Sequence, residues 1–274
     1  MTDLRGLIEK AGANDVAWED PALPGRLITL RSARPRRCTP HTPVLFVHHG
    51  VLRNGLDYRD FWLPLVDEAD LLVVAPEFPN ESFPGADFYN FGNRIGADGA
   101  EKPRAEWTYG VDGRVFARLQ AQGITQQARY GVWGHSAGGQ FVHRMMSLGF
   151  RDHVAAAVTA NAGTYAMADL YEPWPFGLAD TGLDQEALEA LLRFRLTVMA
   201  GTDDIDATSA HFPKEPAAMR QGGTRYERAH RYIAAARAAL PDCAWTIVDV
   251  AGVGHDGEAM SGAAAPILSA ALHA

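Results

Sequence analysis

Residues 131–141 read GVWGHSAGGQF. The apolar run RYGVW at 129–133 is typical of a buried strand, and AGGQFVHRMMSLGF at 137–150 is typical of a helix. Between them a single serine, Ser136, stands among glycines, which favour tight turns. The stretch therefore predicts a strand, a sharp turn at Ser136 and a helix.

The same kind of strand recurs along the chain. Short apolar runs rich in branched residues lie at 26–30, 44–47, 71–75, 129–133, 153–160, 196–200 and 245–250. Their apolarity is continuous rather than alternating, which suits strands covered on both faces. Residues 111–123 and 224–241 instead repeat apolar side chains at the helical period, and Pro241 ends the second stretch. Strands that alternate with helices predict an α/β fold with a mostly parallel sheet and helices on both sides.

Neither an internal repeat nor a low-complexity linker divides the chain, so we expect a single domain over residues 1–274. Two segments, about 77–110 and 161–190, are too irregular for the sheet scaffold and contain Pro, Gly and aromatic residues. We expect lid-like ordered loops over a site. The alternative is ordinary surface loops whose aromatic residues enter the core.

Composition and charge exclude several classes of protein. The chain is 47% hydrophobic and 21% charged, as in ordinary globular proteins, and its formal net charge of −8 argues against binding of nucleic acid. Two cysteines, Cys38 and Cys243, provide no disulfide framework. The first residues are too charged for a signal peptide, and no run approaches the ~18 apolar residues of a membrane span. We therefore expect a cytoplasmic protein without a membrane span.

Gly134, Ser136 and Gly138 form the pattern GxSxG between the predicted strand and helix. In that context the serine lies on a strained turn, and glycines flank it because side chains there would collide with neighbouring backbone. The N–H of Ala137, at the start of the helix, would then face a developing oxyanion. The pattern predicts that Ser136 is a nucleophile, against the alternative of an inert loop serine.

A serine hydroxyl needs a base, and the base needs an orienting carboxylate. GTDDID at 201–206 follows one late strand, and AGVGHDGEAM at 251–260 follows the last, so Asp204 and His255 stand beyond strand ends in the order Ser, Asp, His. We prefer Asp204, three residues after Gly201, as the acid. Asp206 is the second candidate, and Asp203 is expected to cap a turn or face water.

The second oxyanion donor is expected in the loop after the strand at 44–47. There the N–H of Val51, or else that of Leu52, could point at the substrate oxygen. His48 and His49 are neighbours on an extended chain, so their side chains point to opposite faces, and no metal site is expected. We expect His49 to shape this loop.

These motifs together resemble the α/β-hydrolase superfamily from about residue 26 to 270: HHG at 48–50, GHSAGG at 134–139, GTDDID at 201–206 and GVGHDG at 252–257 stand in that superfamily's order. YRDFW at 58–62, FYNFG at 88–92 and AMRQGGTRYERA at 218–229 are more loosely similar to bacterial polyhydroxyalkanoate depolymerase-like and esterase-like hydrolases. The resemblance implies a central, mostly parallel eight-stranded sheet, hydrolysis of a carboxylic ester and no cofactor.

We therefore predict a serine hydrolase that acts on a small-molecule ester through an acyl-enzyme. Ser136 is the nucleophile, His255 the base and Asp204 the orienting acid, with Ala137 and Val51 as oxyanion donors. The expected substrate-binding residues are His49, Leu52, Phe88, Tyr89, Trp107, His135, Tyr165, Trp174 and Phe176.

Several alternatives remain open at this point. The same three residues would serve an amidase or peptidase, a thioesterase or a perhydrolase, and a non-catalytic ligand-binding homologue could keep the scaffold. A dehalogenase or epoxide hydrolase would carry an aspartate where this chain has Ser136. The sequence also leaves open whether two copies form a homodimer.

Overall fold

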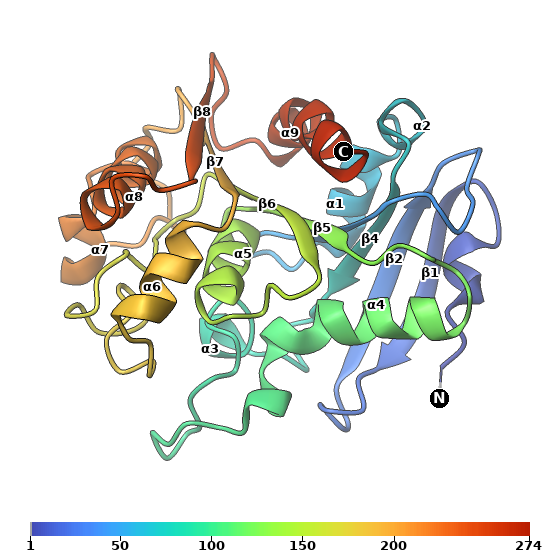
Figure 1. Cartoon of the computed structure of the whole chain (residues 1–274), viewed down its shortest axis with the longest axis horizontal. Coiled ribbons are helices and arrows are strands. Elements are labelled where there is room, and N and C mark those ends of the chain that lie inside the picture. Colours follow the sequence, from blue (N-terminus) through green and yellow to red (C-terminus); the bar gives the residue numbers. More distant parts are fainter. Residues whose placement is uncertain (1) are drawn as a thin grey trace.

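The structure, a computed structural model, describes residues 2–274. Within these residues eight strands form one sheet in the order β1-β2-β4-β3-β5-β6-β7-β8 (Figure 1). β1 and β2 run antiparallel to their neighbours, and all the other neighbouring pairs are parallel. The strands are β1 (Gly12–Glu19), β2 (Leu27–Arg34), β3 (Val44–His48), β4 (Leu72–Glu77), β5 (Tyr130–His135), β6 (Val154–Ala160), β7 (Leu196–Gly201) and β8 (Thr246–Val250).

Helices cover both faces of this sheet (Figure 1). One face carries α1 (Gly55–Trp62), α2 (Val66–Ala69) and α9 (Gly257–Leu272). The other carries α4 (Val111–Ala121), α5 (Ala137–Ser147), α6 (Gln185–Leu192) and α8 (Arg225–Ala239). Shorter helices complete the described chain: α3 (Gly85–Phe88), α7 (Pro216–Arg220) and the 3-10 helices η1 (Arg5–Ile8), η2 (Arg104–Glu106) and η3 (Thr108–Gly110).

The alternation of side chains along the central strands builds two cores. On β3, Val44 and Phe46 pack into the core on the α5 side, while Leu45 and Val47 pack into the core beneath α1 and α9. All four side chains are fully buried. A strand buried on both faces must be apolar throughout, and this explains the continuous apolar run that the sequence shows there.

The predicted α/β fold with a mostly parallel eight-stranded sheet is confirmed. The sequence pattern did not predict β1, because this strand is an edge strand with alternating exposure and its sequence, GANDVAWE, includes Asn14 and Asp15. A continuous apolar run is typical of a strand that is covered on both faces. A search for such runs therefore misses an edge strand that is exposed on one face.

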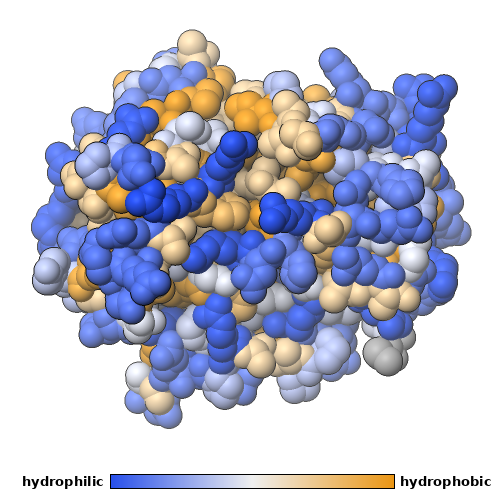
Figure 2. Space-filling view, viewed as in Figure 1, coloured by the Kyte–Doolittle hydropathy of each residue, from blue (hydrophilic) through white to orange (hydrophobic). Residues whose placement is uncertain are grey.

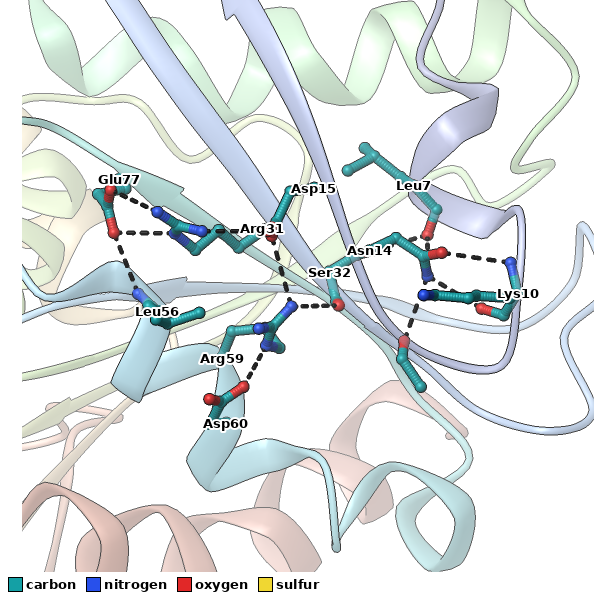
Figure 3. A network of polar contacts seen from close by, with 11 residues as sticks. Leu7, Lys10, Asn14, Asp15, Arg31, Ser32, Leu56, Arg59, Asp60 and Glu77 are labelled. Atoms are coloured by element: carbon teal, nitrogen blue, oxygen red, sulfur yellow. Dashed lines mark hydrogen bonds and ion pairs between the residues drawn. The ribbon is translucent and has the colours of Figure 1, made fainter.

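A polar network ties the antiparallel edge of the sheet to α1 (Figure 3). Arg31 on β2 donates to both carboxylate oxygens of Glu77 at 2.8 Å and to Asp15 of β1 at 3.1 Å. Glu77 also accepts the backbone N–H of Leu56 at 3.1 Å, and Arg59 of α1 lies 3.4 Å from Asp15. The helix α1 is thereby anchored to the end of β4 through Glu77 and to β1 through Asp15.

Hydrophilic side chains dominate the margins of the face in Figure 2, while hydrophobic ones gather in its upper part near β8 and α9. Within residues 2–274, each helix is too short or too polar to cross a bilayer.

Candidate active site

Ser136 lies at the turn between β5 and α5 with φ 59° and ψ −118°, a region that non-glycine residues rarely adopt. The turn is possible because glycines flank it. A Cβ atom on Gly134 would lie 2.2 Å from the carbonyl oxygen of Gly138, and one on Gly138 would lie 2.1 Å from the carbonyl oxygen of His48. Both glycines of the motif are therefore required by close backbone contacts, and the strained turn presents the hydroxyl of Ser136 beyond the sheet edge.

The three residues of the predicted triad meet at the carboxyl ends of β5, β7 and β8. His255 Nε2 lies 2.9 Å from Ser136 Oγ, and His255 Nδ1 lies 2.7 Å from Asp204 Oδ2. The Asp204 side chain is 1% exposed and that of His255 is 31% exposed. An ionised carboxylate can only accept, so His255 carries its proton on Nδ1 and offers the Nε2 lone pair to the serine hydroxyl.

Asn161, directly after β6, holds the loop that carries His255. Its Oδ1 accepts the N–H of Gly201 at 2.8 Å, and its Nδ2 donates to the carbonyl of Gly254 at 3.0 Å. A Cβ atom on Gly201 would lie 2.3 Å from the carbonyl oxygen of Val253. The end of β7 and the histidine loop are therefore packed backbone to backbone, with one amide side chain joining them.

The two predicted oxyanion donors line the same cavity as Ser136. Ala137 is the first residue of α5, so its N–H has no acceptor within the helix. Val51 follows β3 in a turn that the bond from the N–H of Arg53 to the carbonyl of Gly50 closes at 3.2 Å. Both amides come from backbone that strand ends fix in position, as transition-state stabilisation requires.

A second histidine, His135, packs against the ring of His255. His135 is buried, its ring centroid lies 4.6 Å from that of His255, and its Nδ1 lies 2.8 Å from the hydroxyl of Tyr58 on α1. The Tyr58 oxygen in turn accepts a hydrogen bond from the backbone N–H of Gly50. Burial, with help from the neighbouring His255 and Arg225, holds the pKa of His135 well below its usual range. A neutral ring therefore packs against His255.

The histidine pair after β3 has a different role. His48 Nε2 lies 2.8 Å from Asp112, and both side chains are fully buried. His49 Nε2 accepts the N–H of Phe78 at 3.0 Å, and its Nδ1 donates to the carbonyl of Gly50 at 2.9 Å. Across residues 2–274, no group of three or more His, Cys, Asp or Glu side chains could hold a metal ion. The pair thus packs and orders the loop that carries Val51.

Solved structures now identify the family. No protein-family model and no curated protein sequence matches this chain. The crystal structure of LpqC, a poly(3-hydroxybutyrate) depolymerase from Bordetella parapertussis, is 41% identical and covers 96% of this chain and 92% of its own, with a TM-score of 0.90. The chain belongs to the α/β-hydrolase superfamily.

Poly(aspartic acid) hydrolase-1 from Sphingomonas sp. KT-1 is also similar to this α/β-hydrolase. It is 33% identical, with a TM-score of 0.90, and the match covers 94% of this chain and 99% of that one. An S-formylglutathione hydrolase from Agrobacterium tumefaciens, 15% identical with a TM-score of 0.61 over 95% of each chain, shares the fold. The two relatives above 30% identity support a hydrolase.

The cavity beside Ser136 has a volume of about 230 Å³. Both irregular segments contribute to its lining, the first through Asn80, Asn90 and Phe91 and the second through Gly163, Thr164 and Phe176. Both segments therefore contribute to the cavity that contains Ser136, and their role as lids stays a prediction.

The predicted aromatic wall is wrong for five of its six members. Among these six described residues, Phe176 alone lines the cavity. Tyr89, Trp107 and Tyr165 are buried in the core, and Phe88 and Trp174 pack against it. The three buried rings contact neighbouring aromatic or histidine rings, as Tyr89 does His49 at 4.5 Å between ring centroids. Phe88 and Trp174 instead lie against arginine or lysine side chains. The alternative, aromatic residues that enter the core, applies to these five.

Three further predicted substrate-binding residues also lie away from the cavity lining. His49 and His135 are buried beneath the loop and the nucleophile, and Leu52 is 71% exposed. Asp206, the second candidate for the acid, is exposed and accepts from the N–H and the hydroxyl of Thr208 at 2.7 and 2.6 Å. It therefore faces away from His255.

Sequence reasoning missed several polar residues that line the cavity, among them Gln140 on α5 and Arg225 at the start of α8. Arg225 Nη1 lies 3.4 Å from Asp204 Oδ1, and its side chain is 3% exposed. Gln140 is one turn beyond Ser136, so its position four residues after the nucleophile could have placed it on the cavity side. Nothing local in the sequence distinguishes Arg225 from the other arginines of α8.

Proposed function

We propose that this α/β-hydrolase cleaves carboxylic esters through an acyl-enzyme formed on Ser136. One observation carries the proposal: Ser136, His255 and Asp204 form an unbroken hydrogen-bonded line, with distances of 2.9 and 2.7 Å, at one edge of the sheet. A serine hydroxyl that donates to a histidine whose other nitrogen is held by a buried carboxylate is an activated nucleophile.

In the first half-reaction, Ser136 Oγ attacks the ester carbonyl carbon while its proton moves to His255 Nε2. Asp204 stabilises the imidazolium that forms. The N–H groups of Ala137 and Val51 donate to the oxygen that becomes negative in the tetrahedral intermediate. Collapse of this intermediate breaks the bond to the alcohol oxygen, which takes the proton from His255 as the alcohol leaves.

In the second half-reaction, water gives a proton to His255 Nε2 and attacks the acyl carbon. The second tetrahedral intermediate uses the same two N–H donors, and its collapse returns the proton to Ser136 and releases the acid. Every proton transfer passes through one nitrogen atom, so the orientation of the His255 ring by Asp204 serves both halves.

An ester is the first candidate substrate because the relative with 41% identity is a poly(3-hydroxybutyrate) depolymerase, and poly(3-hydroxybutyrate) is a polyester. An amide is the second candidate because the relative with 33% identity is a poly(aspartic acid) hydrolase. The same triad supports both reactions, and the amide demands better protonation of its leaving nitrogen. Relative kcat/KM on an ester, a thioester and an amide of one acyl group discriminates among these substrates.

The test of the nucleophile is covalent labelling. The protein is incubated with a fluorophosphonate and analysed by intact mass and by peptide mapping, beside Ser136→Ala. We expect one adduct, mapped to Ser136, and none on the variant, together with ester turnover that the variant loses. A folded protein that takes no adduct and cleaves no ester would overturn the proposed function.

A further inference from the structure

The amide of Gln140 is held with its N–H donors free beside the cavity. Its Oε1 accepts from Arg144 at 2.9 Å, Thr164 at 3.0 Å and Asn90 at 3.1 Å. A guanidinium can only donate, so these three bonds fix which end of the amide is the oxygen. The Nε2 group of Gln140 therefore lies on the other side of the amide, near Gly163. It donates no hydrogen bond to any of the described residues.

Behind Gln140 lies a fully buried cation without a counter-ion. Arg144 donates to the carbonyl of Pro175, to Gln140 and to Thr164, and no carboxylate in residues 2–274 lies within ion-pair distance of it. Burial lowers the pKa of Arg144 to about 10, so it remains charged at neutral pH. A buried charge that lacks an opposite charge is costly, and proteins usually pair it.

Two more guanidinium groups line the cavity itself. Arg53 donates to the carbonyls of Phe78 and Gly85 and, among the described residues, has no carboxylate partner. Arg225 is 3% exposed, its Nη1 contacts Asp204 at 3.4 Å, and its Nε and Nη2 have no partner in the part of the chain that the structure describes. Buried polar groups are normally hydrogen-bonded, so the unsatisfied donors of Arg225 point to a missing acceptor.

The negative charges near the cavity do not balance these three cations. Asp204 is shared between Arg225 and His255. Asp206 also interacts with Arg225, but it is exposed and accepts two hydrogen bonds from Thr208. Glu215, which also lines the cavity, is exposed and interacts with Arg228, where it opposes the lowering of the arginine pKa by burial. The cavity therefore presents hydrogen-bond donors and excess positive charge, although the whole chain has a formal net charge of −8.

Resting on the ester hydrolysis proposed above, we propose that the cavity selects esters that bear a free carboxylate a few carbon atoms from the scissile bond. The substrate carboxylate would accept from Gln140 Nε2 and the free donors of Arg225, and would supply the counter-charge that Arg53 and Arg144 lack. The preferred substrate class is thus an anionic half-ester or acyloxy acid.

Two matched pairs of substrates test this selectivity. Monomethyl glutarate is compared with methyl pentanoate, which has a methyl group where the first has its carboxylate, and 4-acetoxybutanoate is compared with butyl acetate. We expect kcat/KM to favour the charged ester about tenfold or more in at least one pair, as a charge-assisted hydrogen bond would give. The pair that shows the preference tells whether the carboxylate belongs to the acid or to the alcohol.

Two variants test the roles of Gln140 and Arg225. For each variant we compare kcat/KM on the charged ester with kcat/KM on its neutral partner, because a loss of activity that affects both esters equally leaves this ratio unchanged. Gln140→Glu gives Arg144 an internal carboxylate of nearly the same shape, so the preference for the charged ester should disappear. Arg225→Gln removes the unsatisfied donors and should also reduce the ratio. Arg193→Gln, at an exposed residue that pairs with Asp242, is the matched control and should keep the wild-type ratio.

Equal or faster cleavage of the neutral ester in both pairs would overturn the inference, as would a ratio that survives both Gln140→Glu and Arg225→Gln. Labelling of Ser136 by a fluorophosphonate without cleavage of either charged ester would overturn this inference and leave an activated serine. Absence of both labelling and cleavage in the folded protein would instead reject the proposed function and this inference with it.

Discussion

The imidazole of His135 lies 4.6 Å, centroid to centroid, from the imidazole of His255. One ring is buried and held neutral, while the other is half-buried and faces Ser136. The hydroxyl of Tyr58 ties the buried ring to the loop that precedes Val51, through the N–H of Gly50. Tyr58 therefore holds in position both His135 and the loop that carries Val51.

We expect Tyr58→Phe to lower kcat about fivefold and to leave KM unchanged, because one lost hydrogen bond is worth about 1 kcal/mol and both contacts orient groups that act in the transition state. Steady-state kinetics on one ester checks this. Tyr171→Phe, at a side chain that is 93% exposed, is the control. A raised KM with an intact kcat would show that Tyr58 acts on substrate binding instead.

Asp204→Asn should lower kcat by about 10⁴-fold, as in the serine protease triad, because an amide cannot hold the same tautomer of His255. Asp206→Asn should have little effect, since Asp206 bonds only within its own exposed turn. Single-turnover acylation rates for the two variants provide the measurement. A large loss for Asp206→Asn and none for Asp204→Asn would exchange the two roles.

Gly138→Ala should prevent the native elbow, because its Cβ would lie 2.1 Å from the carbonyl oxygen of His48 and neither backbone can move without breaking the turn. We expect a loss of several degrees in Tm and no labelling of Ser136. Gly262→Ala on α9 is the matched control: its Cβ would meet no atom within 4 Å, so it should stabilise the helix by about 1 kcal/mol. Thermal unfolding and fluorophosphonate labelling of both variants decide the matter, and a fully active Gly138→Ala would contradict the steric argument.

Acid should destabilise the fold through its buried histidines. Burial lowers the pKa of His49 to about 3 from 6.5, and it holds the pKa values of His135 and His143 well below the usual range. These rings stay neutral in the folded chain but take up protons in the unfolded chain below about pH 6.5. Stability is therefore complete above that pH and falls as the pH drops toward the folded pKa, by at most about 1.4 kcal/mol per pH unit for each ring.

Urea unfolding at pH 7.5, 6.5, 5.5 and 4.5 measures this slope. His49→Gln keeps one donor and one acceptor without a group that titrates there, so its stability should fall less steeply below pH 6.5. His41→Gln, at an exposed histidine, should follow the wild-type slope. Identical slopes for all three proteins would rule out His49 as a source of the acid sensitivity.

The sequence predicts the scaffold because parallel strands place their carboxyl ends at the same edge of the sheet. Ser136, Asp204 and His255 each follow a strand, and adjacent parallel strands end at one edge, so residues 68 and 51 positions apart meet there. Local sequence could not separate Asp204 from Asp206, which follow the same strand. The turn closed by the N–H of Asp204 on the carbonyl of Gly201 directs Asp204 inward, and Thr208 holds Asp206 outward.

The pocket was harder to predict, because it depends on how irregular segments fold back. Tyr89 and Tyr165 lie in segments that line the cavity, but their rings pack against His49 and Tyr232 in the interior. An irregular loop has no regular spacing of apolar residues, so its sequence does not show which side of it faces a cavity. Arg225 is equally hard to find, since only its contact with Asp204, 21 residues earlier, distinguishes it, whereas the spacing of Gln140 from Ser136 was an available signal.

The contact between Gly138 and the carbonyl of His48 joins the elbow to the strand that leads into the Val51 loop. The two amides that we propose as oxyanion donors, those of Ala137 and Val51, therefore belong to one rigid body, and neither can adjust to a new substrate alone. About half of the cavity lining, in contrast, comes from segments 77–110 and 161–190, which the sheet does not constrain in this way. Evolution could thus change what the protein recognises by exchanging these two loops, while the reacting geometry is inherited unaltered.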